Sequence, residues 1–162
     1  MKKTEYFLKL STWKGYCPVA RHYYASIRWN DGDYNYETLE HNVREECIFC
    51  KGKKCEYCDN NGWVPYKTSR FDSESEARMF ALDWFRKRGD NGILYLGDSA
   101  YMEPHIILAG VPKRTMLAAN RLCNRAEERW REFGVQDKKY LAMYDKWLKL
   151  VHGNPKKKKP RR

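Results

Sequence analysis

Four cysteines lie within the segment CIFCKGKKCEYC, where two Cys-x-x-Cys pairs are separated by four residues. Each such turn aims two sulfurs at one point, and two turns supply the four soft ligands that zinc binds in a tetrahedron. Gly52, in the connection, is free to adopt the positive φ that lets one turn fold back on the other. The spacing predicts one structural Zn²⁺, and its four ligands are Cys47, Cys50, Cys55 and Cys58.

The cysteine segment also resembles a known zinc module. CIFCKG and CEYCDNNGW are similar to compressed forms of the Cys-x-x-Cys-x-Gly-x-Gly unit of the DnaJ-type cysteine-rich zinc domain. In that family the two units that share a zinc ion are well separated along the chain, whereas here they adjoin. Because no J-domain His-Pro-Asp is present, the resemblance implies a compact zinc knuckle over residues 44–63 and no co-chaperone activity. Such knuckles recur in small phage-encoded proteins, which the chain as a whole resembles.

Other uses of the cysteines stay open at this point. A rubredoxin-like iron site, an iron–sulfur cluster or a pair of redox dithiols would need the same residues, and His41 is a reserve metal ligand. The side-chain charges of residues 44–59 other than cysteine cancel. Four thiolates on one Zn²⁺ would therefore make the knuckle net negative. We interpret the lysines of the connection as offsetting the thiolate charge, with a phosphate clamp as the alternative.

The net charge of +11 is concentrated in the last third of the chain. Residues 1–112 hold 16 basic and 16 acidic side chains, whereas residues 113–152 hold 10 basic and 5 acidic ones. The remaining six cations lie in the tail PKKKKPRR. A neutral body followed by a basic segment is typical of a protein that binds a polyanion.

The first two thirds of the sequence predict strands and one helix. TEYFLKL, HYYASIRW and YNYETLEH have strand character, and the Asp-Gly of NDGD predicts a hairpin between the last two. GWVPYKTSR predicts a strand that returns from the cysteines, so the metal site is expected at a strand tip. ILYLG and HIILAG are short apolar runs typical of buried strands. These patterns predict an α+β fold with a small antiparallel sheet.

The sequence also contains local signals for three helices. Ser73 and Glu76 form a capping box before an apolar face at helical spacing, which predicts a helix packed on the sheet. Pro112 opens a long helix over residues 113–133, Gly134 stops it, and a second helix follows at about residues 136–151. Both helices carry an apolar stripe, so they are expected to form a hairpin.

The predicted organisation has three parts. Residues 1–112 form a zinc-containing α+β domain, residues 113–152 a basic helical hairpin, and residues 153–162 a disordered Lys/Arg tail. The tail should attract polyanions without reading their sequence. Its cations are Lys156, Lys157, Lys158, Lys159, Arg161 and Arg162.

Four arginines of the first hairpin helix fall within about 80° of one another on a helical wheel. They are Arg114, Arg121, Arg125 and Arg129. Such a ridge could follow a phosphate backbone, because guanidinium groups match phosphate oxygens. Alternatively, the ridge is a solvated helix face in which Glu128 and Glu132 pair with the arginines.

The leading functional hypothesis is a non-enzymatic accessory protein that binds DNA or RNA through this ridge and the tail, with exposed Tyr or Trp stacking on bases. The alternative is a protein-binding module, such as a phage factor that inhibits or redirects a host complex. ILYLGDSAY resembles the Gly-Asp-Ser block of GDSL-type hydrolases, but no downstream Asp-x-x-His follows to complete a triad. We therefore expect no enzymatic activity, and the oligomeric state is open.

The sequence favours a cytoplasmic protein with no membrane partner. No 18-residue apolar run and no signal-peptide pattern occur in it. If the protein is phage-encoded, the compartment is the host cytoplasm, where thiols stay reduced and paired cysteines favour metal binding. PKKKKPRR is similar to a monopartite nuclear localisation signal, which would imply the nucleus in a eukaryotic cell.

Overall fold

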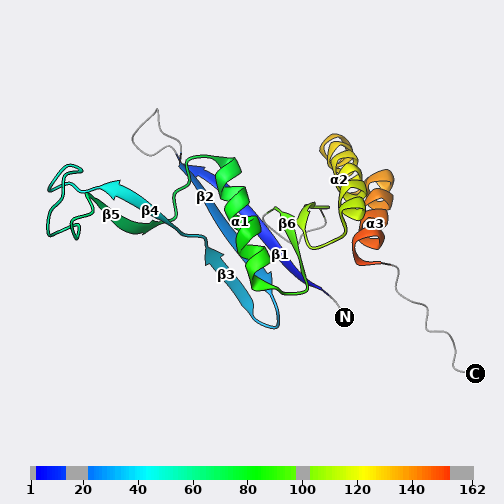
Figure 1. The fold of residues 1–162 in the computed structure, drawn as a ribbon. Coiled ribbons are helices and arrows are strands. Elements are labelled where there is room, and N and C mark those ends of the chain that lie inside the picture. The colour runs from blue at the N-terminus through cyan, green and yellow to red at the C-terminus, as the bar shows by residue number, and fades with distance from the viewer. Residues whose placement is uncertain (1–2, 14–21, 98–102, 154–162) are drawn as a thin grey trace, which may run out of the picture. The chain divides into compact units, whose positions relative to one another are not determined.

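The computed structural model describes residues 3–13, 22–97 and 103–153 of the 162-residue chain (Figure 1). It has an α+β fold, as the sequence predicted. In chain order the elements are β1 (Thr4–Trp13), β2 (His22–Asn30), β3 (Tyr34–Thr38), β4 (His41–Glu46), β5 (Trp63–Thr68), α1 (Glu74–Arg88), β6 (Gly92–Leu96), β7 (Ile106–Ala109), α2 (Lys113–Phe133) and α3 (Lys138–His152).

The chain divides into two compact units. One unit contains residues 1–9, 27–36 and 82–162, and the other contains residues 10–26 and 37–81. The α2–α3 hairpin therefore belongs to the first unit together with β6 and β7, and the four-cysteine segment belongs to the second.

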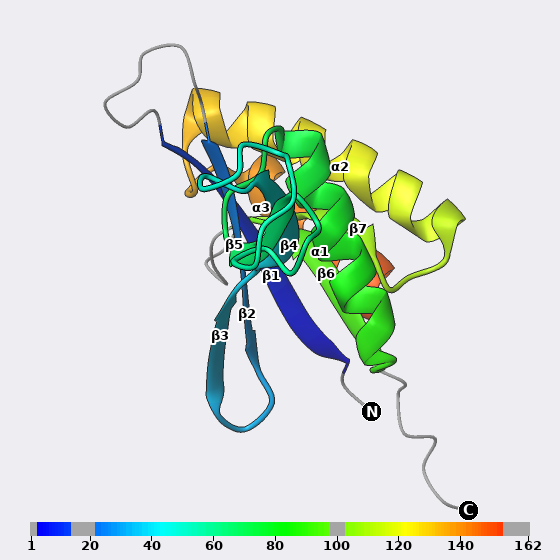
Figure 2. The ribbon, with the colours of Figure 1, turned by 60° about the vertical axis from the view of Figure 1, so that its left-hand side comes forward.

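The larger sheet has the strand order β3-β2-β1-β6-β7. β1 pairs with β6 in parallel, with Thr4 opposite Gly92 and Leu8 opposite Leu96, whereas β6 pairs with β7 antiparallel. The sheet is thus mixed, which corrects the expectation of antiparallel strands alone. Figure 2 shows the predicted β2–β3 hairpin, whose turn contains Gly32 at a φ of +117°.

One hydrophobic cluster of the first unit lies between the β6–β7 pair and the helical hairpin. Tyr95 and Ile107 on the strands pack with Cys123 on α2 and Trp147 on α3, and all four side chains are buried. The apolar stripes predicted for the two helices account for these contacts. Phe133, at the end of the predicted α2 stripe, is instead exposed.

Helix α2 is also attached to β7 by polar contacts. The side-chain amide of Asn120 accepts a hydrogen bond from the Ile107 N–H (2.7 Å) and donates one to the Ile107 carbonyl (3.0 Å). One half-buried side chain thereby satisfies both backbone groups of a residue in the end strand of the sheet.

The predicted capping box forms at the start of α1. The Glu76 N–H donates to Ser73 Oγ (3.1 Å), and the Glu76 carboxylate accepts from the Asp72 N–H (3.2 Å). The reciprocal bond thus reaches one residue before Ser73. One N–H of the first helical turn and one N–H just before the helix are satisfied in this way.

Asp137 joins the two helices of the hairpin at the N-terminus of α3. Its carboxylate accepts the Tyr140 N–H (2.9 Å) and two bonds from the guanidinium group of Arg129 on α2 (2.7 and 3.1 Å). These bonds, with that from Arg129 the largest influence, lower the pKa of Asp137 from 3.8 to about 2. A charged carboxylate at this position therefore stabilises the hairpin.

Acid should remove this stabilisation. Because the folded-state pKa is depressed, the contribution of Asp137 is complete above about pH 4 and is lost as the pH falls toward 2. We expect Asp137→Asn to lower the thermal midpoint at pH 6, and the gap from the native chain to close between pH 4 and pH 2. Asp145→Asn, which removes an acid from an exposed pair with Lys149, is the matched control and should shift the midpoint less. A gap that does not change with pH would contradict this account.

Candidate metal centre

The four cysteines lie in the loop that joins β4 to β5. These strands form a separate antiparallel pair in which Glu46 is opposite Trp63, and the Cys47 N–H extends the ladder by donating to the Gly62 carbonyl (3.0 Å). The predicted position at the tip of two strands is confirmed (Figure 1). The ladder therefore fixes both ends of the loop.

Each Cys-x-x-Cys pair forms a tight turn. The Lys51 N–H donates to the Cys47 carbonyl (2.8 Å), and the Asn60 N–H donates to the Cys55 carbonyl (2.9 Å). Gly52 adopts the predicted positive φ (+79°). Gly62 has the same φ, and a Cβ atom there would lie 2.7 Å from the Gly52 carbonyl oxygen. The two turns consequently pack closely, and glycine at position 62 makes this possible.

The four cysteine sulfurs form one cluster. All lie within 4.8 Å of one another, and the Cys47–Cys55, Cys50–Cys58 and Cys55–Cys58 sulfurs are each 3.7 Å apart. Zn–S bonds of about 2.3 Å at tetrahedral angles would place sulfurs about 3.8 Å apart. A disulfide, in contrast, requires a bond of about 2.05 Å, and the four cysteines are free. Their arrangement thus matches a tetrahedral metal site.

The close approach of the four thiols perturbs their protonation in opposite directions. Burial and hydrogen bonds with the neighbouring thiols raise the pKa of Cys50 to about 12. At Cys58 burial acts in the same direction, but hydrogen bonds, including one from the Gly62 N–H (3.2 Å), outweigh it and lower the pKa to about 6. Cys58 therefore ionises more readily than Cys50. A divalent cation would stabilise four thiolates.

His41 does not join this cluster. Its ring stacks on Phe71 with centroids 4.3 Å apart, and a ring nitrogen contacts the Arg70 carbonyl. The reserve role considered for it is therefore wrong, because His41 lies at the opposite end of β4 from the cysteines.

The surface of the knuckle carries a feature that the sequence analysis missed. Ile48, Phe49 and Tyr57, which lie between the paired cysteines, are among the most exposed large apolar side chains of the described chain. The lysines of the connection are exposed as well. The alternation of cysteine and aromatic residues was visible, but no local pattern says whether such a ring points inward or outward.

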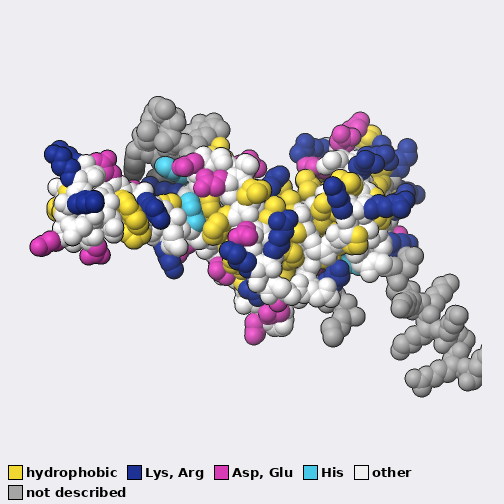
Figure 3. Space-filling model, in the orientation of Figure 1, with side chains coloured by type: hydrophobic (Ala, Val, Ile, Leu, Met, Phe, Trp, Pro, Cys, Tyr) yellow, Lys and Arg dark blue, Asp and Glu magenta, His cyan; other side chains and the backbone are white. Residues whose placement is uncertain are grey.

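The predicted arginine ridge is split by the fold. Arg114, Arg121 and Arg125 are exposed on α2, and no ion pair between described residues involves them. Arg129 is instead directed at Asp137, and its guanidinium carbon lies 3.7 Å above the centre of the Phe133 ring. Figure 3 shows Lys and Arg side chains gathered over α2 and α3.

The prediction also named two glutamates of α2 and the cations of the tail. The alternative in which Glu128 and Glu132 pair with the ridge is not seen among the described residues, where Arg129 pairs with Asp137 and Arg131 with Glu127. The predicted phosphate-binding residues of the tail lie outside the described residues. They are Lys156, Lys157, Lys158, Lys159, Arg161 and Arg162.

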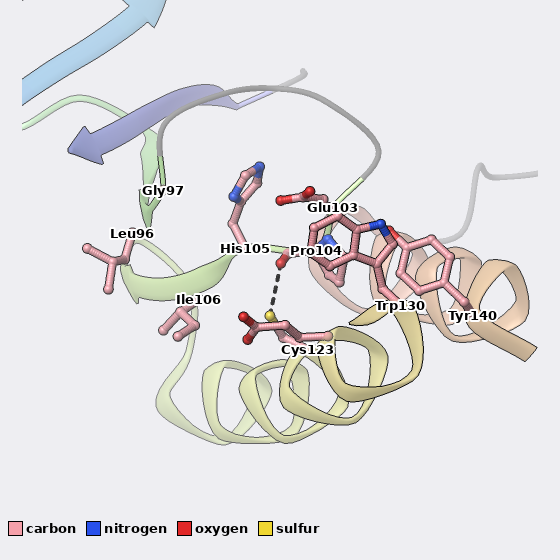
Figure 4. A pocket seen from close by; sticks show the side chains of 10 residues that line it. Leu96, Gly97, Glu103, Pro104, His105, Ile106, Cys123, Trp130 and Tyr140 are labelled. Carbon is pink, nitrogen blue, oxygen red and sulfur yellow. Dashed lines mark hydrogen bonds between the residues drawn. The ribbon is translucent and has the colours of Figure 1, made fainter. Parts of the chain in front are cut away.

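A cavity of about 230 Å³ lies in the first unit, between β6–β7 and the helical hairpin (Figure 4). Glu103, His105, Trp130 and Tyr140 line it. Cys123 also faces it, and its thiol donates a hydrogen bond to the Pro104 carbonyl (2.9 Å). Burial raises the pKa of Cys123 to about 12, so this thiol is a poor nucleophile.

In the part of the chain that the structure describes, no helix is long and apolar enough to cross a membrane. No protein-family model, curated protein or solved structure matches the chain, so the resemblance to the DnaJ-type zinc unit stays an expectation from its motif.

Proposed function

We propose that the protein holds one structural Zn²⁺ and acts as a non-enzymatic nucleic-acid-binding protein. The metal assignment is supported by the sulfur spacing of 3.7 Å and by the all-thiolate ligand set, which favours zinc or iron over hard cations. With four protein ligands, no coordination position is open for catalysis. The ion therefore holds the two turns together.

The exposed arginines of α2 carry the nucleic-acid part of the proposal. Arg114, Arg121 and Arg125 have no carboxylate partner among the described residues, so their guanidinium groups are available to phosphate oxygens. At a rise of about 1.5 Å per residue they are separated by about 10 and 6 Å along the helix. Arg129 is excluded from this set, because Asp137 already accepts two of its hydrogen bonds.

The distribution of charge along the chain also supports binding to a polyanion. The segment after residue 112 contains the whole cationic excess of the chain, and its last ten residues add six cations to those of the hairpin. Contacts of this kind neutralise phosphates and release counterions, so they produce affinity without sequence specificity. We therefore propose that α2 and the tail bind the phosphate backbone.

The salt dependence of binding tests this proposal. For the full chain, the logarithm of affinity for a fluorescein-labelled oligonucleotide should fall linearly with the logarithm of salt concentration. Substitution of Arg114, Arg121 and Arg125 by Gln should reduce the slope by about 2 to 3 units, since each lost phosphate contact removes about 0.7–0.9. A chain that ends at Gly153 should show a further reduction. Fluorescence anisotropy measures both.

A triple variant that removes paired cations is the matched control. Arg78→Gln, Lys87→Gln and Lys149→Gln together remove the same charge, but each of these residues pairs with an acid of its own helix. This control should retain most of the slope. An equal loss in both triple variants would mean that net charge alone attracts the oligonucleotide, and an unchanged slope in the α2 variant would overturn the role of the arginines.

A further inference from the structure

The knuckle presents an aromatic pair to solvent. Phe49 and Tyr57 occupy the same position in the two Cys-x-x-Cys turns, immediately before the second cysteine of each. Their exposures are 66% and 64%, and that of the neighbouring Ile48 is 76%. The two rings meet edge to face with centroids 4.4 Å apart. Two turns that are distinct in sequence therefore build one exposed apolar surface.

The backbone under this surface is fixed. Each aromatic residue is adjacent to a sulfur ligand, Cys50 or Cys58, and the turns are closed by backbone hydrogen bonds. Metal binding would fix the backbone that carries both rings, so less conformational entropy is lost when a ligand stacks on them. Zinc coordination requires only the cysteines, and hence it does not explain why large apolar groups stand at these exposed positions.

The charges around the rings indicate what would bind there. Lys51, Lys53 and Lys54 are exposed, and they take part in no ion pair with another described residue. Of the four cysteines, Cys47 and Cys58 are buried, whereas Cys50 and Cys55 are half-buried. Exposed aromatic rings on two turns whose connection carries three exposed lysines complement a ligand that combines flat rings with phosphates.

We propose that Ile48, Phe49 and Tyr57 stack on the unpaired bases of a single-stranded nucleic acid, while the three lysines contact its phosphates. This rests on the proposed nucleic-acid binding and specifies the form of the ligand. Duplex bases are already stacked within the helix and cannot reach the rings, whereas the bases of a single strand can. Because exposed Glu56 and Asp59 lie close in sequence to the lysines, stacking contributes more affinity here than charge does.

The test compares single- and double-stranded probes. With a fluorescein-labelled 12-nucleotide oligothymidylate, Phe49→Ala combined with Tyr57→Ala should weaken binding about 10- to 100-fold, the range expected for the loss of base stacking. The salt slope should stay unchanged, and so should affinity for a 12-base-pair duplex. Metal content of about one equivalent would verify that the variant knuckle is folded.

A second exposed pair provides the control. Tyr34 and Tyr36 on β3 are 66% and 56% exposed, so Tyr34→Ala with Tyr36→Ala removes a similar aromatic area elsewhere. This variant should bind the oligothymidylate as the native chain does. Equal losses from both pairs would overturn the assignment of stacking to the knuckle.

The remaining outcomes separate the two proposals. If the knuckle variant binds oligothymidylate normally while the α2 triple variant still loses salt slope, stacking at the knuckle is refuted and nucleic-acid binding stands. If the native chain binds neither probe, both proposals fail. A pull-down gives the last outcome. If the native chain captures a protein even after nuclease treatment, the Phe49→Ala/Tyr57→Ala variant does not capture it, and oligonucleotide binding is unchanged, the stacking proposal is overturned in favour of a protein ligand.

Discussion

Replacement of Cys55 by serine is expected to reduce bound zinc from about one equivalent to nearly none. The substitution removes one of the four ligands, so only three thiolates remain to bind the ion. Structural zinc contributes on the order of 10–16 kcal/mol of apparent binding free energy in small zinc modules, and this energy is coupled to folding. The β4–β5 loop should therefore become sensitive to protease. Metal analysis and limited proteolysis measure the two effects.

Cys123→Ser is the matched control for this experiment. Cys123 is far from the cluster in sequence and belongs to the other unit, and a serine hydroxyl could still donate to the Pro104 carbonyl. Metal content should not change in this variant. A Cys55→Ser protein that retains a full equivalent of zinc would contradict the four-sulfur site. One equivalent of iron in the native protein would show that the site holds a single iron ion and not zinc.

The second large effect is expected at Gly110, immediately after β7. A Cβ atom there would lie 2.2 Å from the Gly92 carbonyl oxygen and 2.7 Å from the Ile93 Cα, and the φ of Gly110 is +101°. Backbone atoms cannot move aside as a flexible side chain would. Gly110→Ala should lower the free energy of unfolding by about 2–5 kcal/mol, because overpacking costs about 1–3 kcal/mol and the unfavourable φ about 1–2 kcal/mol. Urea denaturation measures the change.

Gly134→Ala separates these two contributions. Gly134 also has a positive φ (+79°), but no atom lies within 4 Å of the position its Cβ would take. Its substitution should therefore cost about 1–2 kcal/mol from backbone strain alone. Equal costs at the two positions would show that the close approach of Gly110 to β6 is absent in solution.

The features of the fold that depend on local chemistry were predictable. Pro112 and Gly134 delimit α2 at the predicted residues, and Ser73 with Glu76 marks the start of α1. The parallel pairing of β1 with β6 was not predictable, because paired residues such as Thr4 and Gly92 are 88 positions apart and a local pattern cannot identify a distant partner. Similarly, β4 was not predicted, because the predicted strand YNYETLEH covers β3 and ends at His41, the first residue of β4. Leu39, whose N–H donates to the Ala25 carbonyl, lies between β3 and β4.

The candidate site was predictable to the same extent. The spacing of the cysteines was enough to bring four sulfurs together, since both turns are short and adjacent. The pairing of Arg129 with Asp137 could not be predicted from a helical wheel. A wheel describes a single helix, and Asp137 lies at the start of the next one. The exposed position of Phe49 and Tyr57 likewise depends on how the two turns pack.

Asn120 has a consequence for the behaviour of the protein at high concentration. β7 is the last strand of its sheet, and an unpaired outer edge would offer free N–H and C=O groups to a strand from another molecule. The amide of Asn120 occupies both groups of Ile107, which lies within this four-residue strand. Helix α2 thus protects this edge from intermolecular strand addition and the aggregation that follows from it.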